Sequence, residues 1–154
     1  YMDTTENILV LIRHGEAKGH DQGLSELGIM QTEEASALVE TLFPKKYTLK
    51  HLICSNGPCA REGAQIIGKR IEATPLVVDG QAAIGLIESS IEMFPGELPK
   101  VIITRGKFIR DTVPVIAKYF HCKNPLDDDA LPDKGIAYAI ICDFDKKTIE
   151  RVAF

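Results

Sequence analysis

The segment that decides the fold is Ile8-Leu9-Val10-Leu11-Ile12-Arg13-His14-Gly15-Glu16. Its first five residues are all leucine or β-branched, a pattern typical of a strand that is buried on both faces. Such strands belong to parallel sheets, in which helices cover both sides. We therefore expect a central strand over residues 8–12, with Arg13 and His14 just beyond its carboxyl end.

On either side of this segment, apolar runs alternate with amphipathic stretches along the whole chain. The sequence predicts further strands over 51–55, 75–78 and 101–104, and a closing hairpin from 136–143 and 148–154. It predicts helices over 35–42 (with Ser25 as an upstream N-cap), over 58–71, over 83–94 and over 108–120. Pro114 is expected to kink the last helix or to delay its start.

Strands that alternate with helices predict an α/β fold with a mostly parallel central sheet. We expect a three-layer α/β/α sandwich with helices on both faces of that sheet. A chain of 154 residues suits one domain, so residues 1–154 are expected to form a single unit. Tyr1 precedes Met2, and we expect it to be an artificial remnant.

Composition limits the possible functions. A net charge of −4 and a pI near 5.6 disfavour a nucleic-acid partner, because such binders usually carry a basic domain. No apolar run approaches the roughly 18 residues of a membrane span, and no secretory signal is visible. The four cysteines lack zinc-type spacing, so we expect a cytoplasmic protein with reduced thiols, no metal and no cofactor. The oligomeric state stays open.

Cationic residues follow several of the predicted strands. Arg13 and His14 follow the first strand, Arg105 follows the strand at 101–104, and Arg61 lies on the first turn of the helix after 51–55. The carboxyl ends of parallel strands share one edge of the sheet, where ligands bind in such folds. Because arginine matches phosphate oxygens and helix N-termini favour anions, this edge is expected to bind a phosphoryl group.

Each arginine taken alone would more readily be read as a scattered surface charge. Their joint position at the ends of three strands favours a site. Gly15 and Gly106 strengthen this interpretation, since glycine lets the backbone come close to a ligand.

Four ordered segments resemble the motifs of the histidine phosphatase superfamily, also called the phosphoglycerate mutase-like family. Residues 11–17 resemble its R-H-G signature, and residues 24–31 resemble its L-[ST]-x-x-G-x-x-Q helix start. Residues 58–61 are similar to its P-x-x-R segment, and residues 102–110 to its late H-G-x-x-I-R segment. A single match would be weak, but four in the right order are specific.

The resemblance implies a phosphoglycerate mutase-like fold and a metal-independent phosphatase in which His14 forms a phosphohistidine intermediate. Arg13, Arg61 and Gly15 would bind the phosphoryl group. Glu88 would be the general acid, by its spacing from Arg61 alone, with Glu92 as a competitor. The short spans between the motifs resemble those of the compact branch, the small phosphohistidine phosphatases. A phosphorylated protein or small molecule would be the partner.

The sequence departs from the family pattern at two places. Arg105 stands where the family has its second histidine, and Lys107 adds a further cation. An arginine binds phosphate but cannot exchange a proton at ordinary pH, so turnover is expected to be slow or absent. Glu62-Gly63-Ala64-Gln65 replaces the usual A-x-x-T. Two functions therefore stay open: a phosphatase acting through His14, or an impaired relative that binds a phosphate-bearing ligand.

Overall fold

A computed structural model describes residues 7–19, 22–43, 49, 51–78, 98–126 and 137–154. Its strands are β1 (Ile8–Arg13), β2 (His51–Ser55), β3 (Leu76–Val78), β4 (Lys100–Thr104), β5 (Tyr138–Asp143) and β6 (Thr148–Ala153). Its helices are α1 (Glu26–Leu42), α2 (Pro58–Ile71) and α4 (Gly106–Phe120). The helix expected over 83–94 lies outside the described residues.

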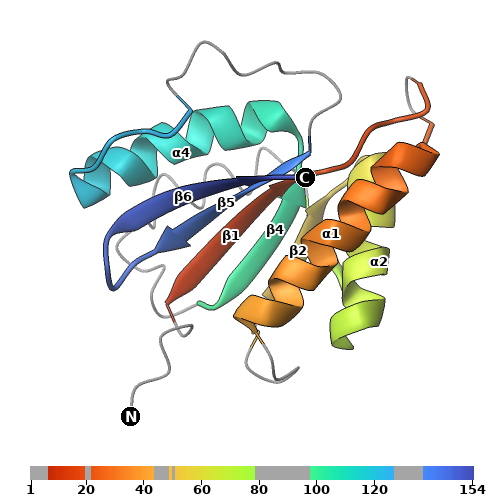
Figure 1. Ribbon diagram of the computed structural model, residues 1–154, viewed down its shortest axis with the longest axis horizontal. Coiled ribbons are helices and arrows are strands. Elements are labelled where there is room, and N and C mark those ends of the chain that lie inside the picture. The colour runs from red at the N-terminus through yellow and green to blue at the C-terminus, as the bar shows by residue number, and fades with distance from the viewer. Residues whose placement is uncertain (1–6, 20–21, 44–48, 50, 79–97, 127–136) are drawn as a thin grey trace.

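The strands form one sheet in the order β3-β2-β4-β1-β5-β6 (Figure 1). β1, β2, β3 and β4 run parallel, whereas β5 and β6 add an antiparallel hairpin beside β1. Both the mostly parallel sheet and the closing hairpin were predicted from the sequence.

Helices cover both faces of the sheet, so the expected three-layer α/β/α arrangement is confirmed (Figure 1). On one face, α1 and α2 pack against alternate residues of the central strands, among them Val10, Ile12 and Ile103. On the other face, α4 packs against the intervening residues, among them Leu9 and Leu11. The period of two in a strand thus divides one apolar run between two cores.

Helix α4 corrects one expectation. It does not start late: it begins at Gly106 and continues through Pro114 to Phe120. Pro114 lies on the exposed side of the helix. Its cost to the helix is one missing backbone hydrogen bond and the crowding of its ring against the preceding turn. The opposite side buries a row of apolar residues against the sheet: Phe108, Ile109, Val113, Ile116 and Phe120. That burial outweighs the proline.

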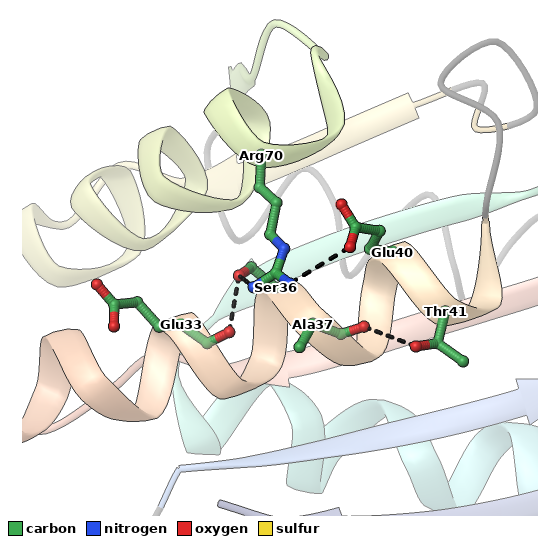
Figure 2. A network of polar contacts seen from close by, with 6 residues as sticks. All are labelled: Glu33, Ser36, Ala37, Glu40, Thr41 and Arg70. Atoms are coloured by element: carbon green, nitrogen blue, oxygen red, sulfur yellow. Dashed lines mark hydrogen bonds and ion pairs between the residues drawn. The ribbon is translucent and has the colours of Figure 1, made fainter.

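A polar contact joins α1 to α2 at their outer side (Figure 2). The two terminal nitrogens of Arg70 donate to Ser36 Oγ at 3.2 Å and to Glu40 Oε1 at 3.3 Å. Both charged side chains are about half exposed, so the pair contributes at most about 1 kcal/mol. The buried apolar faces therefore do most to hold these two helices together. Within the described residues, no helix is long and apolar enough to cross a membrane.

Two glycines of α2 differ in the space around them, which gives a matched pair for a stability test. A β-carbon on Gly63 would lie at ordinary contact distance, 3.6 Å from Ile103 Cγ2, whereas one on Gly68 would collide with the Ala73 carbonyl oxygen. We expect Gly63→Ala to raise the free energy of unfolding by about 0.4–1 kcal/mol, through lost freedom of the unfolded chain. Gly68→Ala should lower it by about 1–3 kcal/mol. Urea unfolding measures both, and equal effects would contradict the packing described.

Candidate active site

The connections of the sheet leave β1 and β4 in opposite directions. From β1 the chain passes through α1 toward β2 on one side, and from β4 it passes through α4 toward β5 on the other. Neighbouring parallel strands whose connections leave in opposite directions form a topological switch point, where α/β folds bind ligands. The residues that follow β1 and β4, His14 and Arg105, lie at this point.

His14 is fixed at the end of β1 by its backbone and by its ring. Its amide donates to the Thr104 carbonyl at 3.1 Å, which extends the pairing with β4 past the last strand residue. Its Nδ1 lies 2.8 Å from the carbonyl oxygen of Gly15. A carbonyl only accepts, so Nδ1 carries the hydrogen of the neutral ring. Nε2 therefore keeps its lone pair, as a nucleophile requires.

The surroundings of His14 favour the neutral ring. Burial of the half-buried imidazole lowers its pKa below the usual 6.5, and the charges of Arg13 and Arg105 lower it further. The hydrogen bond to Gly15 opposes this shift in part. Both arginines are thus close enough to act on the ring, and Nε2 is unprotonated at neutral pH.

Glycine at position 106 makes room for Arg13. A β-carbon there would lie 3.1 Å from Arg13 Nε, so the guanidinium of Arg13 packs against the start of α4. Arg105 is the N-cap residue of that helix, and its side chain is exposed. Two guanidinium groups and a helix N-terminus therefore meet beside His14, and each of them favours an anion.

The start of α1 packs directly on the loop that carries His14. A β-carbon on Gly15 would collide with the backbone of Gly28, and one on Gly28 would collide with the Glu16 carbonyl oxygen. Both glycines are buried. Here glycine is required by close approach of two backbones.

Two polar side chains of α1 hold the same loop. Ser25 caps the helix as predicted, because its Oγ accepts from the Gly28 amide at 3.0 Å. The Ser25 amide donates to the Glu16 carbonyl at 2.9 Å, and the buried Gln31 accepts from the Glu16 amide at 3.0 Å. The serine, glycine and glutamine of the second motif thus all serve to fix the residues next to His14.

Arg61 lies at the same edge of the sheet, just after β2. It is exposed on the first turn of α2, and its charge lowers the pKa of the Cys54 thiol near the end of β2, against a larger rise caused by burial. The structure therefore brings Arg13, His14, Gly15 and Arg105 together around one ring. Arg61 follows β2, which β4 separates from β1 in the sheet.

Glu88 and Glu92 lie outside the described residues. Within the described part of the chain, no three His, Cys, Asp or Glu side chains gather in a way that could hold a metal ion.

Sequence reasoning did not assign roles to Gln31 or Glu62, although both hold the loop after β1. Gln31 could have been found, because a glutamine on the buried side of a helix needs a polar partner. Glu62 gave no such signal, since an exposed glutamate near a helix start is ordinary.

The fold is shared with solved phosphatase structures. A proposed phosphohistidine phosphatase SixA from Agrobacterium tumefaciens is 14% identical with a TM-score of 0.62, over 88% of this chain and 91% of that one. A protein histidine phosphatase SixA in complex with tungstate is 12% identical with a TM-score of 0.60, over 95% and 96%. A mycobacterial glucosyl-3-phosphoglycerate phosphatase in complex with VO3 is 16% identical with a TM-score of 0.56, over 96% and 97%.

No protein-family model matches this sequence, and no curated protein matches it. The similarity therefore lies in the fold, which is the phosphoglycerate mutase-like fold that the four motifs predicted.

The environment of His14 predicts how it titrates. We expect its pKa, measured by NMR of the ring carbons, to lie below 6.5, and we expect Arg105→Ala to raise it, since one cation is removed. Lys118→Ala, at the far end of α4, serves as the control. Because the unfolded state takes up this proton first, His14 should lower stability as the pH falls through 6.5. A pKa at or above 6.5 would contradict the geometry.

Proposed function

We propose that this protein is a phosphatase that acts through a phosphohistidine intermediate on His14. The observation that carries the proposal is the ring itself. Its Nδ1 is 2.8 Å from a carbonyl oxygen, and Nε2 keeps its lone pair at neutral pH because burial and the charges of Arg13 and Arg105 lower the pKa of the ring. Catalysis by a histidine nucleophile needs a ring whose tautomer, orientation and pKa are set in this way.

In the first step, His14 Nε2 attacks phosphorus and the bond from phosphorus to the leaving oxygen or nitrogen breaks. The leaving group takes a proton from a general acid, and the phosphoryl group is held on Nε2. Phosphoryl transfer mainly requires that the reacting groups be positioned and that cations neutralise the charge on the equatorial oxygens. We assign this neutralising role to Arg13 and Arg105, beside the His14 ring, and to Arg61, which follows β2.

In the second step, water attacks phosphorus and the bond from phosphorus to Nε2 breaks. The carboxylate left by the general acid takes a proton from the attacking water, and inorganic phosphate leaves. Glu88 remains our candidate for that acid, with Glu92 as the competitor. The acid must be protonated in the first step and unprotonated in the second.

The comparisons support the reaction class and suggest the substrate class. The solved structures with this fold include a protein histidine phosphatase with tungstate and a glucosyl-3-phosphoglycerate phosphatase with VO3 or inorganic phosphate. Tungstate is an oxyanion like phosphate, so a site for such an anion fits the cluster around His14. We propose that the substrate is a phosphorylated protein or small molecule in the cytoplasm.

Arg105 favours a second candidate function. It replaces a histidine of the family pattern, stays charged, and acts directly on the ring of His14. A permanent cation at this place strengthens anion binding and slows the release of phosphate. In the second candidate, the protein holds a phosphate-bearing ligand with little or no turnover.

Loss of the nucleophile tests the first candidate. We expect wild type to hydrolyse p-nitrophenyl phosphate and His14→Ala to lose at least about 10³-fold in kcat, as when a covalent nucleophile is removed. Quenched wild type should carry acid-labile, base-stable phosphate, and the variant should carry none. The acid limb of kcat/KM should have its midpoint below pH 6.5, since the reactive form is neutral His14. Undiminished hydrolysis by His14→Ala would refute the mechanism.

Restoring the family's histidine separates the two candidates. If Arg105 slows turnover by retaining phosphate, Arg105→His should raise kcat about tenfold or more and weaken inorganic phosphate binding, since one charge-assisted contact becomes weaker. Lys118→His, an exposed change on the same helix, should alter neither. A wild type that binds phosphate without hydrolysis, and gains activity in Arg105→His, would establish the binding protein. Unchanged hydrolysis in Arg105→His would show that Arg105 does not limit the rate of turnover.

A further inference from the structure

Glu62 reaches from α2 to the loop that follows β1. Its Oε2 accepts a hydrogen bond from the Leu24 amide at 2.9 Å, across 38 residues of sequence. Leu24 is 1% exposed, so burial of its side chain in the core also fixes this point of the loop. The carboxylate thus completes an anchor between α2 and the loop.

Gly23 is shaped by the same carboxylate. A β-carbon on Gly23 would collide with Glu62 Oε1 and would lie 2.7 Å from its Cδ. The backbone of Gly23 does not have the positive φ that favours glycine. An alanine at position 23 would therefore displace the flexible Glu62 carboxylate from its contact with Leu24, although the local backbone conformation accepts a side chain.

The anchored limb pairs with the residues next to His14. Leu24 bridges to Ala17 in antiparallel fashion, and the Lys18 amide donates to the Gly23 carbonyl at 3.0 Å. The Ser25 amide then donates to the Glu16 carbonyl at 2.9 Å. A displacement at Leu24 therefore reaches Glu16, two residues from the nucleophile, through backbone hydrogen bonds alone.

The residue before Glu62 is Arg61, one of the three arginines to which our proposal assigns phosphate binding. One turn of a rigid helix thus carries both the guanidinium and the anchor of the His14 loop. We propose that Glu62 is a positioning residue, which sets the place of Arg61 relative to His14 by holding Leu24 against α2. This inference rests on the proposed function only for its effect on turnover; the anchor itself stands on the contacts.

A simpler role for Glu62 is a favourable charge near the N-terminus of α2. That role would require the charge, whereas the anchor requires an acceptor atom. Glu62→Gln removes the charge and keeps an oxygen that can accept from Leu24. The conservative variant therefore distinguishes the two roles.

The test compares Glu62→Ala, Glu62→Gln, Gly23→Ala and the double variant Glu62→Ala/Gly23→Ala. For each we would measure kcat and KM for p-nitrophenyl phosphate, the affinity for inorganic phosphate, the melting temperature and the hydrogen exchange of the Leu24 amide. Glu34→Ala and Gly63→Ala are the matched controls, because each makes the same chemical change where the structure tolerates it.

We expect Glu62→Ala and Gly23→Ala each to lower kcat/KM by about 10- to 100-fold, the range for a misplaced catalytic group. Both should speed exchange of the Leu24 amide, because the first removes the carboxylate that protects it and the second displaces that carboxylate with an added methyl group. The double variant should be no worse than either single one, since both remove the same contact. Glu62→Gln should retain most of the activity and of the protection.

Additive losses in the double variant, or a Glu62→Gln variant as impaired as Glu62→Ala, would overturn the proposal. So would losses of activity that follow the melting temperature with no change at Leu24. If wild type hydrolyses nothing, the proposed function fails, but phosphate affinity and Leu24 exchange still test the anchor: unchanged values in Glu62→Ala would overturn it.

Discussion

Gly15 and Gly28 approach so closely that neither can carry a side chain, and the candidate site depends on that contact. It lets the start of α1 lie on the loop after β1, where Ser25 and Gln31 take up the backbone groups of Glu16. A loop that leaves a buried strand has orphan amides and carbonyls, which must find partners. Here Ser25 and α1 supply partners for the amide and the carbonyl of Glu16, so the backbone next to His14 is held by hydrogen bonds on both of these groups.

The topology also brings positively charged side chains to the end of β1, where α1 holds the loop that follows. Because β1 and β4 are neighbours whose connections diverge, Arg13, His14 and Arg105 lie at one edge of the sheet in an acidic protein. Half-burial and two cations act on the ring in the same direction, toward the neutral form. An anion bound at this edge would offset both cations, so an empty site and a loaded site differ in the proton affinity of His14.

Much of this arrangement could be predicted from the sequence, because it follows from local patterns. The apolar run at 8–12 predicted a strand buried on two faces, and Ser25 predicted a helix start. The late start expected from Pro114 was wrong, because the apolar face that α4 buries outweighs the local cost of proline, whereas the kink stays a prediction. Glu62 was not foreseen, because its partner is 38 residues away and is a backbone amide. The roles of all the predicted site residues remain predictions: His14, Glu88, Arg13, Gly15, Arg61 and Arg105.

The loop between β1 and α1 is closed at its base. Three contacts lie between its outer part and His14: the hydrogen bond from Lys18 to Gly23, the bridge from Ala17 to Leu24 and the bond from Leu24 to Glu62. Sequence can therefore vary between Gly19 and Gln22, in length as well as in character, while the imidazole keeps its place. In evolutionary terms, the contacts that fix His14 and the residues beyond them form separable modules, so relatives could diversify beyond this base without moving the ring.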